Sequence, residues 1–498
     1  MIGLDLGTTN CKAVLLDADG HVRARASEGY GLQNPRPGWA EQDARLMWGA
    51  VTRVLRSVAS AAPVAPQGIS LSGAMHSLFP VADDAGTPIA NAMTWADARA
   101  AVVHGRLVAG RDTHAIYRRT GCPVHSTYHL QRLRWWHEYA PEQARAAHLW
   151  VGLKDWILHE LARVWATDLS LASTTGLLSL RDLAWDAEAL ELAGVGADRL
   201  PALVSPSAVV GKLTEEAAAA AGLPAGLPVV AGGSDGAMAN LGTGTAAPGG
   251  TVITVGTSGA VRRMVGAPWF DPGERTWCYL LDEGLYFVGG AINNGGLALE
   301  WVRDRLYPDL AGPAGFEQLA SDAASVAPGA EGVFMLPYFA GERSPYWAPD
   351  DRAMLYGLGV GHTRAHIARA AMEGVANCLA DVWDALNGTE EGGQIVRLTG
   401  GITRTPPWAQ ILADMLGVEL MASEAADASA MGAALLGMRA LGLPGAGGLA
   451  RTVEPGRTYT PDQRSHRFYT RHHRAHKALR LGMAAMGEAL EDLEESAL

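Results

Sequence analysis

The chain has 498 residues, more than one hydrophobic core usually supports, so we expect two domains. A hydrophobic content of 48% and a charged content of 18% are typical of a globular protein, and a formal net charge of −12 argues against an obligate nucleic-acid binder or a membrane-surface protein. Four widely spaced cysteines without a CxxC pair, no readable signal peptide and no uncharged apolar run of membrane-spanning length lead us to expect a cytoplasmic protein.

The chain begins with a predicted β-rich unit. Residues 2–6 and 11–17 are apolar and strand-like, and GTTN at 7–10 is a tight turn between them. HVRARASE at 21–28 continues as a third strand, and apolar residues spaced by three and four positions predict a helix from about Asp43. The expected order is therefore strand, strand, strand, helix.

The same unit occurs a second time in the chain. VGTS at 255–258 aligns on LGTT at 6–9, within a second strand–turn–strand at 251–264, and another hairpin and a helix follow. The alignment places Thr254 opposite Asp5. The duplicated scaffold thus has a carboxylate in its first copy only.

A pattern typical of nucleotide binding lies farther along the second copy. A long helix with an apolar face is predicted over 366–388, and a strand at 395–401 runs into Gly400 and Gly401 before another helix. Backbone N–H groups become accessible where strand, glycine and helix meet in an α/β protein. A simple tight turn is the structural alternative for this segment.

The phosphate-binding pattern differs from the two common fingerprints. The sequence contains no GxxxxGK[ST], and no GxGxxG follows its first strand. The two turns that contain GT[TS] have small residues, which let backbone amides and hydroxyl groups approach phosphate oxygens from both sides. Asp5, beside the first turn, is suited to a hydrated magnesium ion, which prefers carboxylate, water and phosphate oxygens.

A second carboxylate lies just before the second copy. Residues 229–244, VVAGGSDGAMANLGTG, predict a strand that enters two glycines, after which Asp235 begins a helix of small residues. Asp is among the best helix N-caps, so capping is the structural interpretation. A carboxylate between two nucleotide-binding halves is also suited to accept a proton from a substrate hydroxyl group, and the two roles are compatible.

Taken together, the motifs DLGTTNCK, GGSDG, VGTSG and TGG resemble, in this order, those of the FGGY carbohydrate kinases, a family of the actin-like ATPase and hexokinase superfamily. Residues 353–373 fit the second signature of that family. Residues 127–135 depart from its first signature at His129, where Pro, Ser or Thr is usual, and at Arg132, where Lys is usual.

The resemblance implies an α/β fold of two ribonuclease-H-like domains, at about 1–246 and 247–498, with ATP in the cleft between them and Asp235 as the general base. The residues implied to bind nucleotide, phosphate or Mg²⁺ are Asp5, which would hold the metal, Gly7, Thr8, Thr9, Lys12, Gly256, Thr257, Gly400 and Gly401. The residues implied to line the sugar pocket are Met75, His76, Trp95, His125 and Gly236. A structural role in the core is the alternative for His76 and Trp95.

Within the family, SGAMHSLFPVADDAG, NAMTWADAR and PYFAGERSPYW resemble the branch that acts on gluconate, and Gly236 stands where xylulokinase-like members usually have Asn. This implies ATP-dependent phosphorylation of D-gluconate at its terminal hydroxyl group, giving 6-phospho-D-gluconate. A homodimer is the assembly that family members often form. The alternatives are a kinase for a ketopentose or polyol, an ATP-driven switch of the actin or chaperone kind, and a kinase-like binding protein without activity.

Two further features have two interpretations each. Arg343 in AGERSPYW could meet the carboxylate of a sugar acid or a phosphate, or could form an ion pair with Glu342 or another acid. His472 and His476 are one helical turn apart, which is compatible with a metal site. Their segment offers no carboxylate or cysteine to complete the ligands, so we expect a solvated terminal helix.

Overall fold

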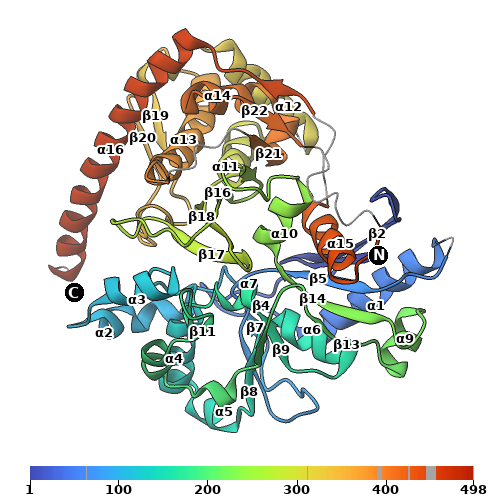
Figure 1. Cartoon of the computed structure of the whole chain (residues 1–498). Helices are drawn as coiled ribbons and strands as arrows, with labels where there is room; N and C mark the ends of the chain where they lie inside the picture. The colour runs from blue at the N-terminus through green and yellow to red at the C-terminus, as the bar shows by residue number, and fades with distance from the viewer. Residues whose placement is uncertain (63, 311, 390–394, 424–426, 445–455, 497–498) are drawn as a thin grey trace.

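A computed structural model of the chain describes residues 1–496 except 63, 311, 390–394, 424–426 and 445–455 (Figure 1). The molecule has two lobes, each built on one mixed β-sheet flanked by helices. The first sheet has the order β13 (Val209–Lys212), β14 (Pro228–Ser234), β5 (Ile69–Gly73), β1 (Ile2–Leu6), β2 (Asn10–Leu16), β3 (Val22–Gly29). The second has the order β17 (Trp277–Asp282), β18 (Leu285–Ile292), β16 (Gly259–Val265), β15 (Thr251–Val255), β21 (Val396–Gly400), β22 (Leu420–Ala422), β23 (Thr458–Tyr459).

Helices surround the two sheets. Those used below are α1 (Ala44–Ser60), α10 (Asp235–Gly242), α11 (Gly296–Leu306), α12 (Pro313–Ser325), α13 (Arg364–Ala385), α14 (Pro406–Leu416), α15 (Ala428–Ala440) and α16 (Gln463–Ser496). The chain between β5 and β13 adds smaller elements to the first lobe, among them β6 (Phe79–Val81), β7 (Ala92–Met93), α2 (His104–Val108), α3 (Thr113–Thr120), α4 (His129–Tyr139), β8 (Leu149–Val151), α6 (Leu153–Ala162), β9 (Ala166–Asp168) and α7 (Leu169–Ala172). None of the helices among the described residues is long and apolar enough to cross a bilayer.

The two sheets contain the same five-stranded core, which confirms the predicted duplication and the α/β fold. β1 pairs antiparallel with β2 and parallel with β5, and β15 pairs in the same way with β16 and β21. The registers agree as well, because Asp5 faces Ser72 on the parallel neighbour and Thr254 faces Thr399. Asp5 and Thr254 therefore occupy equivalent positions in the two lobes.

Helix α1 follows the third strand, as predicted. The Asp43 carboxylate caps it by accepting the backbone N–H groups of Arg45 (2.8 Å) and Leu46 (3.3 Å). The predicted apolar stripe is buried against the first sheet at Met47, Ala50, Val51, Val54, Leu55 and Val58. Burial of this face fixes the helix on the sheet.

Helices α10 and α15 lie side by side between the two lobes (Figure 1). Their backbones approach closely, since a Cβ atom at Gly242 would lie 1.9 Å from the Ala428 carbonyl oxygen and one at Gly432 would lie 1.9 Å from the Met238 carbonyl oxygen. α15 also packs directly on β1, where a Cβ atom at Gly3 would lie 1.9 Å from the Ala430 carbonyl oxygen. A helix from the late part of the chain thus covers the first sheet, while the division at 246/247 stays a prediction.

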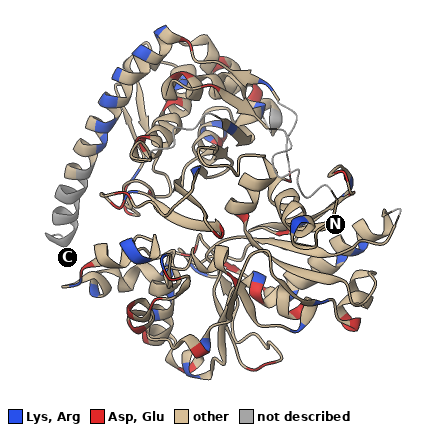
Figure 2. Ribbon diagram, viewed as in Figure 1, with Lys and Arg blue, Asp and Glu red and all other residues tan. Residues whose placement is uncertain are grey.

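The expectation of a solvated terminal helix is wrong for α16. His472 and His476 are 7% and 0% exposed, and α16 packs on α13 through polar residues as well as apolar ones. Glu373 of α13 accepts hydrogen bonds from Tyr469 (2.8 Å) and Arg369 (2.7 Å), and these three side chains are buried. Figure 2 shows that several Lys and Arg residues lie along α16. The prediction failed because the residues of α13 that meet this helix, such as Asn377, whose Nδ2 lies 3.3 Å from His472 Nδ1, are far away in the sequence.

Candidate active site

The first GT[TS] turn, Gly7 to Thr9, lies between β1 and β2 and is held by side chains from three other segments. The Tyr30 hydroxyl donates to the Gly7 carbonyl oxygen, and the Gln42 amide donates to the Thr8 carbonyl oxygen. The Trp95 indole N–H donates to the Thr8 hydroxyl oxygen at 2.9 Å. Because side chains of the protein already bond to these backbone and side-chain oxygens, the turn is pre-organised.

Asp5 stands at the end of β1, next to this turn. Its carboxylate accepts a hydrogen bond from the Ser72 hydroxyl at 2.8 Å, and Lys12, its cross-strand neighbour, lies 3.4 Å from Asp427. Burial, and after it the nearby charge of Asp235, raises the pKa of the Asp5 carboxyl to about 7. Two carboxylates that interact through their charges are an environment that fits a divalent cation.

Asp235 is the first residue of α10, where β14 ends. The structure does not support the interpretation of this residue as the helix cap, because Ser234 is the N-cap and its hydroxyl accepts the Ala237 N–H at 3.4 Å. The Asp235 carboxylate accepts only the adjacent Gly236 N–H, at 2.7 Å, among hydrogen bonds of the described residues. Burial raises the pKa of the Asp235 carboxyl, while the positive charge of Arg262 lowers it. A carboxyl group with a raised pKa is a better proton acceptor than an exposed one.

The second GT[TS] turn, Gly256 to Ser258, lies between β15 and β16 and contacts the start of α11. The N–H groups of Gly295 and Leu297 donate to the Thr257 carbonyl oxygen at 2.9 and 3.1 Å. A Cβ atom at Gly256 would meet nothing within 4 Å, so this stretch of backbone is open to a ligand. The turn therefore presents accessible backbone, as predicted.

Gly400 and Gly401 lie beside this turn, at the end of β21. Gly400 has φ +88° and pairs with Val255, and a Cβ atom at Gly400 would lie 2.4 Å from the Val255 carbonyl oxygen. Only glycine fits there, for both conformational and steric reasons. At Gly401 a Cβ atom would lie 3.6 Å from the same oxygen, an ordinary contact, so steric need is confined to Gly400.

His76 and its surroundings form one wall of the predicted sugar pocket. His76 has φ +68°, a conformation that a non-glycine residue rarely adopts outside sites under constraint. Its Nδ1 lies 2.9 Å from the Thr174 carbonyl oxygen, and because a carbonyl can only accept, Nδ1 bears the proton and Nε2 is left as an acceptor. Burial lowers the pKa of His76, and the Arg132 charge lowers it further, so the ring is neutral.

Arg132 connects the backbone segments that form this wall. Its fully buried guanidinium donates to the backbone carbonyl oxygens of His76 and Thr94 and, through Nε, to that of Ser126 at 3.2 Å. The segment of His76, the segment before Trp95 and the segment of His125 are thereby tied together. Arg132 is one of the two departures from the family's first signature, and its long fork makes contacts that the expected Lys could not make all at once.

Arg343 lies on the opposite side, in the loop after β19 (Phe334–Leu336), with its guanidinium carbon 4.9 Å from the Trp95 ring centre. The proposed ion pair with Glu342 is absent, since Glu342 Oε1 accepts the backbone N–H groups of Asn293 (2.9 Å) and Arg343 (2.8 Å) instead. In the part of the chain that the structure describes, no carboxylate oxygen lies within 4.0 Å of the Arg343 guanidinium. Arg343 is thus a partly buried cation on the pocket side of Trp95 without an acidic partner.

His125 lies farther out than the other predicted pocket residues. Its ring is 5.2 Å from the ring of Trp347, and both residues border a cleft of about 770 Å³ that also includes His104 and Glu274. Burial and the Arg343 charge lower the pKa of His125 to about 3. The structure therefore places His125 at the edge of the site.

Met75 and Gly236 meet at the base of the pocket, together with a residue that sequence reasoning missed. A Cβ atom at Gly236 would lie 3.5 Å from Met75 Cε and 3.0 Å from Arg262 Nε. Arg262 comes from β16 of the second lobe and reaches across to the first residues of α10. The signal in the sequence was a pair of arginines, Arg262 and Arg263, within an otherwise apolar strand, AVRRM, directly after the second turn.

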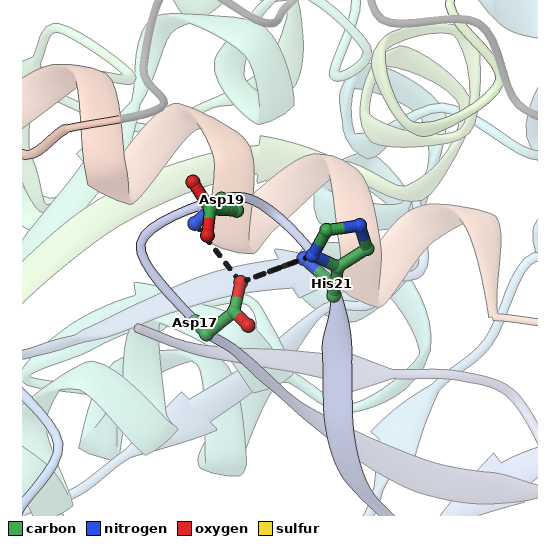
Figure 3. Close-up of side chains that lie close together, drawn as sticks. All are labelled: Asp17, Asp19 and His21. Carbon is green, nitrogen blue, oxygen red and sulfur yellow. Dashed lines mark hydrogen bonds and ion pairs between the residues drawn. The ribbon is translucent and has the colours of Figure 1, made fainter.

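The described residues contain one cluster of three potential metal ligands, Asp17, Asp19 and His21, in the turn between β2 and β3 (Figure 3). The Asp17 carboxylate is already engaged, since it accepts the backbone N–H groups of Asp19 and His21 at 2.9 Å each and pairs with Arg23 at 2.6 Å. These bonds account for the cluster as a stabilised turn.

Comparison with known proteins agrees with this geometry. Residues 1–242 match the model of the FGGY family of carbohydrate kinases, N-terminal domain, and residues 251–441 match that of its C-terminal domain. A gluconokinase of Bacillus licheniformis is 36% identical over 450 residues, covering 89% of this chain and 88% of that protein. The crystal structure of a gluconate kinase from Lactobacillus acidophilus superposes with a TM-score of 0.92 at 29% identity, covering 98% and 99% of the two chains. A ligand-bound xylulose kinase from the same species gives 0.91 at 29% identity, with the same coverage. The chain therefore belongs to the FGGY family of carbohydrate kinases.

Proposed function

We propose that this carbohydrate kinase transfers the γ-phosphoryl group of ATP to the terminal hydroxyl group of D-gluconate, giving 6-phospho-D-gluconate. The observation that supports phosphoryl transfer to a hydroxyl group is the position of Asp235, a carboxylate with a raised pKa at the start of α10, close to Asp5 and between two lobes with phosphate turns. The choice of gluconate is supported by the likeness to the gluconokinase of Bacillus licheniformis.

The proposed roles follow from the contacts of each side chain. Asp235 accepts the proton of the attacking hydroxyl group, because its carboxylate is not used by a cap or an ion pair within 4.0 Å among the described residues. The two turns donate backbone N–H groups to the phosphates, and Trp95 connects the first turn to the sugar pocket through its hydrogen bond to Thr8. Asp5 would hold Mg²⁺, which neutralises phosphate charge when bound.

Closure of the two lobes would limit wasteful hydrolysis of ATP. Residues of both lobes form the site, so a movement of the lobes about α10 and α15 would exclude water and complete it only when the acceptor is bound. The backbones of these two helices are in close contact at Gly242 and Gly432. A cytoplasmic location and a homodimer stay predictions.

A panel of acceptors tests the proposal. ADP release with ATP and Mg²⁺ should be fastest with D-gluconate and much slower with D-xylulose, xylitol and glycerol. Turnover of D-xylulose but not of gluconate would reject the gluconate assignment and favour the kind of substrate named for the xylulose kinase of Lactobacillus acidophilus. Turnover that no sugar, polyol or sugar acid stimulates would instead favour an ATP-driven switch.

A further inference from the structure

Arg262 is a cation of the sugar pocket without an acidic partner. Its Nη1 donates to the Thr254 hydroxyl oxygen at 3.2 Å, whereas its buried Nε has no hydrogen-bond partner. No carboxylate oxygen lies within 4.0 Å of its guanidinium in the described part of the chain, although the charge of Asp235 acts on it. A buried guanidinium group with a free donor is costly unless a ligand completes its hydrogen bonds.

Gly236 provides the space that Arg262 occupies. A Cβ atom at Gly236 would lie 3.0 Å from Arg262 Nε and 3.4 Å from its Cδ, which is tighter than most Cβ contacts, so the Arg262 side chain would have to shift. The backbone does not require glycine here, because Gly236 lies in the first turn of α10 and is not among the residues with positive φ. Glycine destabilises a helix relative to alanine, so the reason for glycine at this position is that it has no side chain.

The rest of the pocket leaves room for a negative charge. Arg343 is the second cation, and its charge and that of Arg262 repel each other. Glu342, the nearest acid to Arg343 in the chain, uses Oε1 for backbone N–H groups, and its charge acts on Arg343 without a carboxylate oxygen within 4.0 Å among the described residues. Two guanidinium groups in one pocket favour an acceptor that brings a carboxylate, which can accept bidentate hydrogen bonds from arginine.

We infer that Arg262, in the space left by Gly236, binds the carboxylate of the acceptor and, together with Arg343, makes the pocket selective for sugar acids. The inference rests on the proposed function and adds the group that recognises the acid. Asp235 acts on the hydroxyl end of the acceptor and Arg262 on its acid end. Arg262 can do so because it is not paired with Asp235.

The test compares D-gluconate with D-gluconamide, which has the same carbon chain and no charge. Wild-type enzyme should prefer gluconate by kcat/KM at least tenfold. Arg262→Gln should lower kcat/KM for gluconate about 10- to 100-fold, mainly through KM, and change that for gluconamide less than about threefold, as expected for loss of a charge-assisted hydrogen bond. Equal losses for both acceptors, or a wild-type enzyme without preference, would overturn the inference.

Variants at Gly236 test whether Arg262 needs the space beside this glycine. Gly236→Asn should reproduce the loss of preference for gluconate, because the new side chain would displace Arg262, and Gly236→Ala should do so to a smaller degree. Arg262→Lys should recover part of the preference, since it restores the charge without the fork. Arg53→Gln, an exposed arginine of α1 that pairs with Glu28, is the matched control and should behave as wild type. Thermal unfolding of each variant shows whether it is folded.

Calorimetry separates failure of this inference from failure of the proposed function. If the wild-type enzyme phosphorylates only neutral sugars, gluconate binding in the presence of MgADP is measured for wild type and Arg262→Gln. If gluconate binds the Arg262→Gln variant at least tenfold more weakly than it binds wild type, Arg262 still recognises the acid group, and only the substrate was assigned wrongly. Equal binding, or none to either protein, would reject that role as well.

Discussion

The general-base role of Asp235 is tested by replacing one oxygen of its carboxylate. Asp235→Asn is nearly isosteric, and the amide oxygen can still accept the Gly236 N–H that Asp235 accepts at 2.7 Å. Ser234 remains the cap of α10, so the helix is not expected to fray. The change thus removes proton acceptance and the negative charge that acts on Asp5 and Arg262, while the size of the side chain and its hydrogen bond are retained.

The expected loss follows from the chemistry of the step. General-base assistance contributes about 10²- to 10⁴-fold, which corresponds to about 3–5 kcal/mol of transition-state free energy. We expect kcat with gluconate to fall by that factor and the Kd for MgADP to stay within about threefold of wild type. The loss of the Asp235 charge should lower the pKa of Asp5, which favours the ionised form of Asp5.

The assay couples ADP release to a spectrophotometric readout, and MgADP affinity is measured separately by calorimetry. Asp43→Asn is a matched control, because it makes the same chemical change at a helix start and Asn also caps helices well. Retention of more than about a tenth of wild-type kcat by Asp235→Asn would refute the reasoning. Loss of nucleotide affinity together with kcat would also refute it, because the carboxylate would then act in binding.

Three more outcomes can be measured on the same preparations. Gly400→Ala places a Cβ atom 2.4 Å from the Val255 carbonyl oxygen at a positive φ, so calorimetric unfolding should show a loss of at least about 1–2 kcal/mol, which Gly361→Ala, in open space, should not show. Trp95→Phe retains a ring for the Arg343 stack but loses the hydrogen bond to the first turn, so kcat/KM should fall about 3- to 10-fold by the ADP assay; an unchanged value would mean that the bond is unimportant. Because the pKa of Asp235 is raised, kcat/KM should decline with falling pH about a midpoint above 3.8, and a profile that stays flat down to pH 4 would contradict a raised pKa.

The fold could be predicted because its signals are local. Alternating apolar residues, the two GT[TS] turns and the stripe of α1 each follow from neighbours in the sequence, and their repetition revealed the duplication. The position of α15 on the first sheet could not be predicted in this way, since it depends on contacts between residues far apart, such as Gly3 and Ala430. The burial of His472 and His476 likewise depends on a polar partner surface on α13 that no local pattern describes.

The two carboxylates of the candidate site could be predicted from the sequence, but the side chains that position its parts could not. Asp5 and Asp235 stood out because a carboxylate is unusual at the end of an apolar strand. The contacts of Arg132 and Arg262 could not be predicted, because their partners are backbone carbonyls and a hydroxyl group contributed by other segments. Such contacts form only when the chain is folded, and no regular spacing of residues in the sequence indicates them.

The duplicated positions of Asp5 and Thr254 show how one scaffold supports two kinds of chemistry. Each residue stands at the end of a first strand and shares a hydrogen bond with a hydroxyl group of the parallel neighbour, Ser72 at 2.8 Å in one lobe and Thr399 at 2.9 Å in the other. The carboxylate gives the first lobe a negative charge in this position. The hydroxyl group of Thr254 in the second lobe instead accepts a hydrogen bond from Arg262, so the same position there holds a cation. On the proposed function, the Asp-to-Thr difference between the copies would place the metal in one lobe and the anion of the substrate in the other, and a symmetric fold would thereby have a single, asymmetric site.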